Sequence, residues 1–179
     1  MEEKEFISQL LDPKTQNEAF KKLLINYQKP IYNHIRSIVI KHDDANDVAQ
    51  NTFIKVFQHL KKFKGESKLF SWIYRIATNE AITFINSKAN RNGVSNDELK
   101  SKLVDNLVAD AHFDGDLIQI KLQKAILSLP EKQQLVFKMK YFEEIKYTDM
   151  SEILDTSVGA LKASYFHAVK KIEAYMIKD

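Results

Sequence analysis

Lysine and aromatic residues alternate in one short segment, and their chemistry suits contact with nucleic acid. Residues 61–68 read KKFKGESK around a single glycine. Ammonium groups attract phosphate, whereas flat rings stack on unpaired bases. The helix predicted to follow carries the only tryptophan, Trp72, mostly off its apolar stripe together with Arg75 and Asn79. The pattern predicts a surface that binds single strands, although the spacing fits equally well with Trp72 and Tyr74 as core aromatic residues.

A second candidate surface lies on the helix predicted just before this segment. Its first turn holds Asp43 and Asp44, which favour the positive end of a helix dipole. Ile54 lies on the polar face, where it is either a knob for docking a partner or a single exposed apolar residue of no special role. The opposite face has the helical spacing of a core stripe, with Val48, Ala49, Phe53, Val56, Phe57 and Leu60. The candidate docking surface comprises Asp44, Asp47, Gln50, Asn51, Ile54 and Lys55.

Helices are expected to position both surfaces. Only 4 Gly and 3 Pro, with repeated helical spacing, predict an all-α chain. A short helix over residues 3–12 is expected to end at Pro13, and another begins near Thr15 or Asn17. Pro30 is expected to restart the chain as the first-turn residue of a further helix. These helices, with the two described above, predict a first helical domain over residues 1–86.

The composition changes after this domain, which predicts a connector over residues 87–115. Residues 87–96 are polar and are expected to form a loop. Ser95 and Glu98 predict a capping box for one short helical piece through Leu103 and Leu107. Acidic side chains outnumber basic ones after Ser95, so we expect a flexible acidic linker.

A second helical domain is predicted over residues 116–179. Pro130 is expected to start a helix that buries Val136, Met139 and Phe142. A helix over residues 147–154, a turn at 155–156 and a last helix capped by Ser157 follow. Two helices joined by a short turn have the helix-turn-helix layout, and an ordinary helical hairpin is the alternative.

The bulk composition and the motifs that are missing narrow the classes of function. The chain has 179 residues, a formal charge of +3 and no cysteine. An acidic N-terminus and the lack of a long apolar run predict a cytoplasmic protein without membrane insertion. Glycine-rich phosphate loops and the HExxH motif are missing, and the five histidines lack ligand spacing. We therefore expect no enzyme, no catalytic residue, no cofactor and no metal site.

Each half of the chain carries several motifs in a fixed order. The first half carries DDANDVAQNTF at 43–53, FKGES at 63–67 and FSWIYRIATNEA at 70–81. Their order and spacing resemble region two of bacterial sigma factors, in the extracytoplasmic-function (ECF) group of the sigma-70 superfamily. The second half carries LPEKQQLVF at 129–137, YTDMSEIL at 147–154 and SVGALKASYFHA at 157–168, which resemble region four. The resemblance covers nearly the whole chain apart from its first helix and the connector.

This resemblance implies a factor that directs core RNA polymerase to promoter DNA and captures the melted strand. The docking surface on the acidic helix would bind the clamp helices of the largest polymerase subunit, and the flap of the second subunit is a further expected contact. Anti-sigma factors are common partners in this family. The downstream element and the melted strand would contact Phe63, Lys64, Gly65, Ser67, Trp72, Arg75 and Asn79.

The last helix would contact the upstream promoter element through the face opposite Val158, Leu161 and Tyr165. The residues expected on that face are Ser157, Gly159, Ala160, Lys162, Ala163, Ser164 and His167, with Lys170 and Lys171 adding attraction to phosphate. Two departures from the family pattern concern this helix, since Ser164 stands where arginine is usual and His167 replaces another basic residue. They predict weaker or AT-leaning contact with the upstream element.

Two other classes of protein remain as alternatives at this point. A free-standing helix-turn-helix regulator would bind operators as a dimer, but it needs neither the lysine-aromatic segment nor the docking surface. A helical adaptor without a nucleic-acid role is compatible with the mild net charge.

Overall fold

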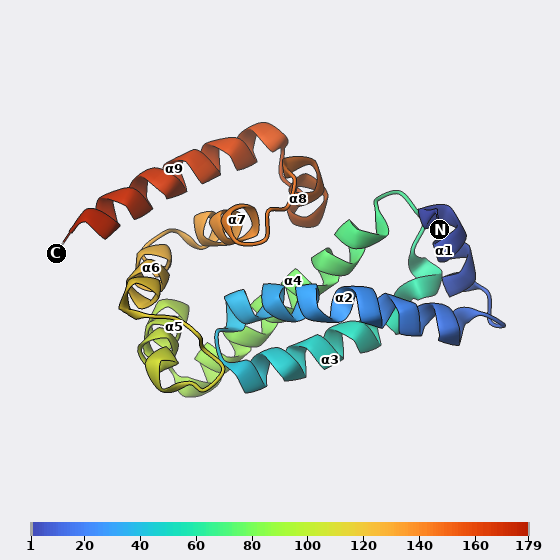
Figure 1. The fold of residues 1–179 in the computed structure, drawn as a ribbon, viewed down its shortest axis with the longest axis horizontal. Helices are drawn as coiled ribbons and strands as arrows, with labels where there is room; N and C mark the ends of the chain where they lie inside the picture. Colours follow the sequence, from blue (N-terminus) through green and yellow to red (C-terminus); the bar gives the residue numbers. More distant parts are fainter. Residues whose placement is uncertain (1, 179) are drawn as a thin grey trace.

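The computed structural model describes residues 2–178, and this part of the chain is helical without β-strands (Figure 1). The prediction of an all-α fold is therefore confirmed. None of the helices in these residues is long and apolar enough to cross a membrane. The elements are α1 Glu3–Leu11, α2 Gln16–Val39, α3 His42–His59, the 3-10 helix η1 Leu60–Lys62, α4 Leu69–Asn92, α5 Asn96–Asp105, the 3-10 helix η2 Leu107–Ala109, α6 Leu117–Leu127, α7 Glu131–Tyr141, α8 Tyr147–Leu154 and α9 Val158–Ile177.

Helices α2, α3 and α4 pack together and form the body of the first half (Figure 1). The prediction that Pro30 begins a new helix is wrong, because Pro30 lies inside the continuous helix α2. Leu23 before the proline and Ile31 and Ile35 after it are all fully buried. Burial of this uninterrupted apolar stripe outweighs the backbone hydrogen bond that a proline removes.

Helix α4 is longer than the sequence suggested. The loop expected over residues 87–96 is wrong for its first part, because α4 continues to Asn92. Ile85 and Ala89 extend the buried stripe and pack against Leu99 of α5. Gly93 then ends the helix in a left-handed conformation with φ of 65°, where a residue without Cβ is unstrained.

The connector is folded over much of its length. Ser95 Oγ accepts a hydrogen bond from Glu98 N at 3.2 Å, and Glu98 caps Ser95 N in return, which confirms the predicted capping box. Val104 and Leu107 are buried in a cluster with residues of α2's end and α6. Residues 96–109 form α5 and η2 and are held by apolar burial despite their acidic surface, and the flexibility of the linker stays a prediction.

The second half has the predicted helix-turn-helix layout of α8 and α9. Asp155 turns the chain in a left-handed conformation with φ of 50°, which aspartate tolerates better than most residues. Ser157 Oγ accepts from Ala160 N at 3.2 Å, so the predicted cap of the last helix is confirmed. The predicted burial of Phe142 is wrong, because α7 ends at Tyr141 and Phe142 is 45% exposed.

The two halves share one hydrophobic core in this structure. Val136 and Met139 of α7 and Met150 of α8 belong to the same buried cluster as Ile35 of α2 and Ile73 of α4. Helix α8 packs directly on α4. The division into domains at residues 1–86, 87–115 and 116–179 stays a prediction.

Candidate docking and nucleic-acid interface

Helix α3 separates a buried face from a polar, exposed face, as its sequence predicted. Val48 and Val56 are buried, whereas Asp47, Gln50 and Asn51 are exposed. Ile54 lies among these polar residues with 54% of its surface exposed. The structure therefore brings four of the six predicted docking residues together on one accessible face.

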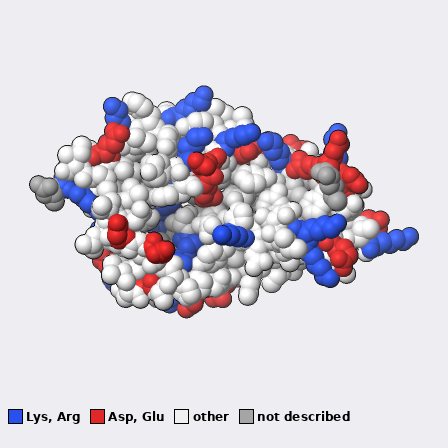
Figure 2. All heavy atoms as spheres, in the orientation of Figure 1, with Lys and Arg blue, Asp and Glu red and all other residues white. Residues whose placement is uncertain are grey.

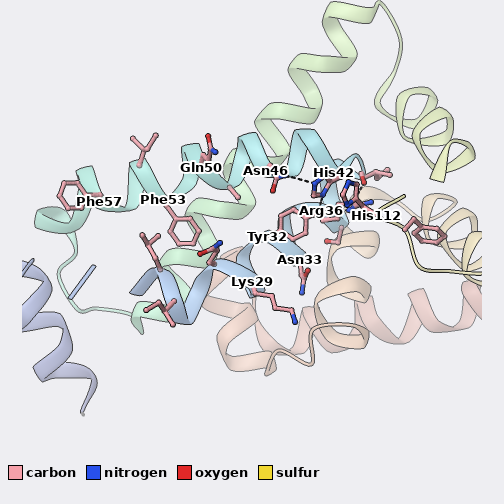
Figure 3. A pocket seen from close by; sticks show the side chains of 18 of the residues that line it. Lys29, Tyr32, Asn33, Arg36, His42, Asn46, Gln50, Phe53, Phe57 and His112 are labelled. Carbon is pink, nitrogen blue, oxygen red and sulfur yellow. Dashed lines mark hydrogen bonds between the residues drawn. The ribbon is translucent and has the colours of Figure 1, made fainter. Parts of the chain in front are cut away.

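An apolar groove of about 1500 Å³ runs beside this face, between α2 and α3 (Figure 3). Gln50 and Ile54 line it from α3, and Ile25 lines it from α2 with 80% of its surface exposed. Phe57 of α3 also lines the groove and is 41% exposed, although its spacing predicted a core position. Sequence reasoning missed Ile25, which could have been noticed because it is apolar and lies off the inward stripe of its helix.

The two remaining docking candidates are paired with α4. Asp44 forms an ion pair with Lys88, and Lys55 forms one with Glu80. Both contacts join α3 to α4, so these side chains already have partners within the chain. Their positions are at the margin of the exposed face and their charges are partly neutralised.

The lysine-aromatic segment combines one buried ring with exposed polar groups. Phe63 is buried in the core, and its ring packs on Trp72 with 5.0 Å between centroids. Lys64 and Gly65 are exposed and Ser67 is half-buried, with Gly65 in a left-handed turn at φ of 73°. Phe63 therefore supports Trp72 from beneath and does not itself lie on the surface.

Helix α4 presents the rest of the candidate strand-binding surface. Arg75 and Asn79 are exposed and Trp72 is half-buried. Tyr74 is instead a core residue, as the alternative interpretation held, and burial raises the pKa of its hydroxyl. The helix is anchored at its start by α1, because Glu3 Oε1 accepts a hydrogen bond from Leu69 N at 2.8 Å.

The predicted duplex-binding face of α9 is accessible. Leu161, Ala168 and Ile172 point into the core. On the outer side the structure exposes Gly159, Ala160, Lys162, Ala163, His167, Lys170 and Lys171, and it leaves Ser164 half-buried. Free backbone N–H groups at the start of this helix are suited to contact phosphate.

A basic and aromatic corner between α8 and α9 was not predicted from the sequence. The Nζ atoms of Lys140 and Lys162 lie 4.5 and 5.8 Å from the centroid of the Tyr147 ring. Partial burial raises the pKa of the Tyr147 hydroxyl, with a smaller contribution from Tyr165. Figure 2 shows Lys and Arg side chains along the upper edge of the molecule, with acidic side chains among them. The three residues come from α7, α8 and α9, so their spacing in the sequence gave no signal.

Comparison with known families accounts for both halves of this arrangement. The family model for Sigma-70 region 2 matches residues 23–91, and that for Sigma-70 region 4 matches residues 119–172. Together these matches cover more than half of the chain. The chain belongs to the sigma-70 family of RNA polymerase sigma factors, in its extracytoplasmic-function group.

Similar proteins span nearly the same length. The chain is 26% identical over 166 residues to the ECF RNA polymerase sigma-E factor of Haemophilus influenzae, covering 87% of this chain and 86% of that protein. It is 28% identical over 163 residues to the RNA polymerase sigma-H factor of Pseudomonas aeruginosa, covering 87% and 84%.

Solved structures share the fold. CnrH, in complex with the cytosolic domain of CnrY, matches with a TM-score of 0.70 and 17% identity, covering 96% of this chain and 95% of that one. The sigma factor RpoE from Bartonella quintana, in complex with the anti-sigma factor NepR, matches with a TM-score of 0.66 and 20% identity, covering 89% and 98%.

Proposed function

We propose that this sigma factor attaches to core RNA polymerase through the exposed face of α3 and reads a promoter at two places. The observation that carries the proposal is the isolated Ile54 in a polar face, next to the apolar groove between α2 and α3. A solvated helix gains nothing from these exposed apolar side chains, whereas a partner that covers them does.

Docking would combine apolar contact with a polar rim. Ile54, Ile25 and Phe57 supply the apolar centre, and their burial against a partner helix would provide most of the attraction. Asp47, Gln50 and Asn51 would form hydrogen bonds around it. By similarity to the family, the partner is the pair of clamp helices of the largest polymerase subunit.

Strand capture would use the turn at residues 64–67 and the outer face of α4. Trp72 offers a ring for stacking on an unpaired base, and Asn79 has both a donor and an acceptor for a base edge. Lys64 and Arg75 would attract the phosphates of the displaced strand. Phe63 would act by holding the Trp72 ring in place.

Duplex recognition would use α9 together with the corner formed by Lys140, Lys162 and Tyr147. Ser157 fixes the start of the helix and orients the N–H groups that meet phosphate. Gly159, Ala160 and Ala163 leave room for a close approach to the duplex. Serine at position 164 and histidine at 167 remove the strong donors that guanine favours, so we expect an AT-leaning upstream element.

The proposal also covers where the protein works and which further partners it contacts. We propose that the protein works in the cytoplasm without catalytic chemistry or a cofactor of its own, because positioning of polymerase requires neither. The flap of the second polymerase subunit is the proposed contact of the second half. An anti-sigma factor is a proposed competitor for the exposed α3 face.

Purified chain and core polymerase would test the proposal. We expect co-purification with core and run-off transcripts that appear only when both are present. Alanine at Asp47, Gln50 and Ile54 should abolish co-purification, whereas alanine at the exposed Glu131 and Lys132 of α7 should leave it intact. Binding to duplex DNA without core, and no effect on transcription, would identify a free-standing regulator and refute the proposal.

A further inference from the structure

A second cavity, of about 600 Å³, is lined by residues of α2, α4 and α7. Tyr74 of α4, Lys138 of α7 and Glu143, which follows α7, meet in its lining. Cavities of this size hold small ligands in many proteins. These three residues belong neither to the docking surface nor to the faces expected to bind DNA, so the proposed function leaves them unused.

The amine of Lys138 is buried without a carboxylate in contact with it. Lys138 is 5% exposed, its Nζ atom donates a hydrogen bond to Ser37 O at 2.6 Å, and it forms no ion pair within residues 2–178. Burial without a paired anion favours the neutral amine. Burial first, and then the positive charge of Lys100, lowers the pKa of Lys138 to about 7, against the opposing effect of Glu143. At neutral pH much of the amine therefore keeps its lone pair, which is the form that acts as a nucleophile.

Two further polar groups in this cavity lack partners. Tyr74 is 3% exposed, and its hydroxyl forms no hydrogen bond with any residue from 2 to 178. Burial raises the pKa of this hydroxyl, so it remains a donor at neutral pH. Glu143 Oε1 lies 2.8 Å from His34 Nδ1, whereas Oε2 is buried and has no partner among the described residues. Buried polar groups are normally satisfied, so a free donor and a free acceptor in one cavity indicate a polar ligand.

We propose that Lys138 binds carbon dioxide as a carbamate in this cavity, with Tyr74 donating to the new carboxylate and Glu143 accepting the proton that leaves. The lone pair of Nζ forms a bond to the carbon of carbon dioxide, and one carbon–oxygen π pair becomes a lone pair on oxygen. Nζ then loses one proton to Glu143 Oε2, which passes it to solvent. The product keeps one N–H on Nζ, which is enough to maintain the hydrogen bond to Ser37 O.

The charges around the cavity suit this product. Lys29 and Arg36 of α2 line the same cavity, although Arg36 is already paired with Asp110 at 3.0 Å. Lys100 repels a protonated Lys138, whereas it would attract a carbamate at the same position. Carbon dioxide is small and uncharged, so it can reach an amine that is almost fully covered. The site goes beyond the proposed function, because neither polymerase nor DNA takes part in it.

Carbon-13 NMR of the protein with labelled bicarbonate at pH 8, in equilibrium with carbon dioxide, would detect the carbamate directly. The wild type should show a carbamate resonance that Lys138→Met lacks. Lys132→Met is the matched control, because Lys132 is an exposed lysine of the same helix, and this variant should keep the resonance. The N-terminal amine contributes equally to all three proteins. Equal carbamate signals in the wild type and Lys138→Met would overturn the proposal.

Chemical trapping locates the carbamate in the wild type, so it does not depend on how a variant folds. An alkyl oxonium reagent converts the carbamate into a stable ester, and mass spectrometry of the digested protein identifies the modified lysine. We expect the ester on Lys138. Trapping confined to exposed lysines and the N-terminal amine would overturn the proposal.

Tyr74→Phe tests the donor while it leaves Lys138 in place. The variant should bind carbon dioxide about tenfold more weakly, as expected for losing a hydrogen bond to a charged group. Tyr141→Phe is the matched control, because Tyr141 is exposed and lies outside this cavity, and its affinity should equal that of the wild type. The rise of the melting temperature with bicarbonate, at fixed pH and ionic strength, would measure both affinities. Equal affinities in the two variants would refute the site as assigned, and all three experiments remain decisive even if run-off transcription fails.

Discussion

The buried ammonium of Lys138 leads to a quantitative prediction about stability and pH. Burial, with a smaller contribution from the positive charge of Lys100, lowers the pKa of Lys138 from 10.5 to about 7, against the opposing effect of Glu143. The unfolded chain exposes this lysine and restores its ordinary pKa. Below about pH 7 both states hold the proton and the full penalty of burial applies. Between pH 7 and 10.5 the unfolded state binds more protons, so this residue makes the free energy of unfolding rise with pH.

The magnitude follows from these two values of the pKa. Linkage gives at most about 1.4 kcal/mol per pH unit, which amounts to about 2 kcal/mol between pH 7 and pH 9. Lys138→Met keeps the length of the side chain but removes the titration and the hydrogen bond to Ser37. The variant should therefore show a smaller rise of the unfolding free energy between pH 7 and pH 9 than the wild type.

Urea unfolding at pH 7, 8 and 9, followed by the fluorescence of Trp72, would measure this difference. Lys132→Met is the matched control, because Lys132 lies on the same helix but is exposed. The control should follow the pH dependence of the wild type. Parallel pH dependences of the wild type and Lys138→Met would refute the reasoning, since Lys138 would then keep its proton in the folded protein.

Three further predictions concern docking, helix capping and duplex binding. Ile54→Ala should weaken binding to core polymerase by about 1 kcal/mol, roughly fivefold in Kd, because about half of the Ile54 surface is exposed and would be buried by the partner. Binding of the variant to core polymerase immobilised on a sensor surface would measure this Kd. Glu3→Ala should lower the free energy of unfolding by about 1 kcal/mol in urea titrations, since Leu69 N loses its cap. Ser157→Ala should lower it by a similar amount and also weaken run-off transcription, because the start of α9 loses its cap.

Each of these predictions has a matched control. Ile177→Ala removes a more exposed isoleucine at the far end of α9 and should leave core binding unchanged. Glu5→Ala removes an exposed carboxylate from α1 and should not alter stability. Ser101→Ala removes the hydroxyl of an exposed serine on α5 and should change neither the free energy of unfolding nor run-off transcription. Equal effects in a variant and its control would show that the named contact does not act as described.

Local sequence determined most of the helices and several of their ends. The spacing of apolar residues placed the inward stripe of α3 correctly except at Phe57, and Ser95, Glu98 and Ser157 mark helix starts through short-range hydrogen bonds. Motif order alone indicated the sigma-70 family. These features depend on residues that are close together in the chain. Their side chains come into contact within a single helix or helix start, so the contacts do not depend on the tertiary structure.

Tertiary structure decided what the sequence could not. Pro30 lies within a helix because the buried stripe on either side of it outweighs its local preference, and α4 passes residue 86 because Ala89 finds a partner on α5. His34 meets Glu143, and Ser37 meets Lys138, only because the two halves pack together. Their separations along the chain are long, so no local pattern reports them. Contacts between distant segments require the folded core that positions both partners, and the largest cluster of that core contains residues of both halves.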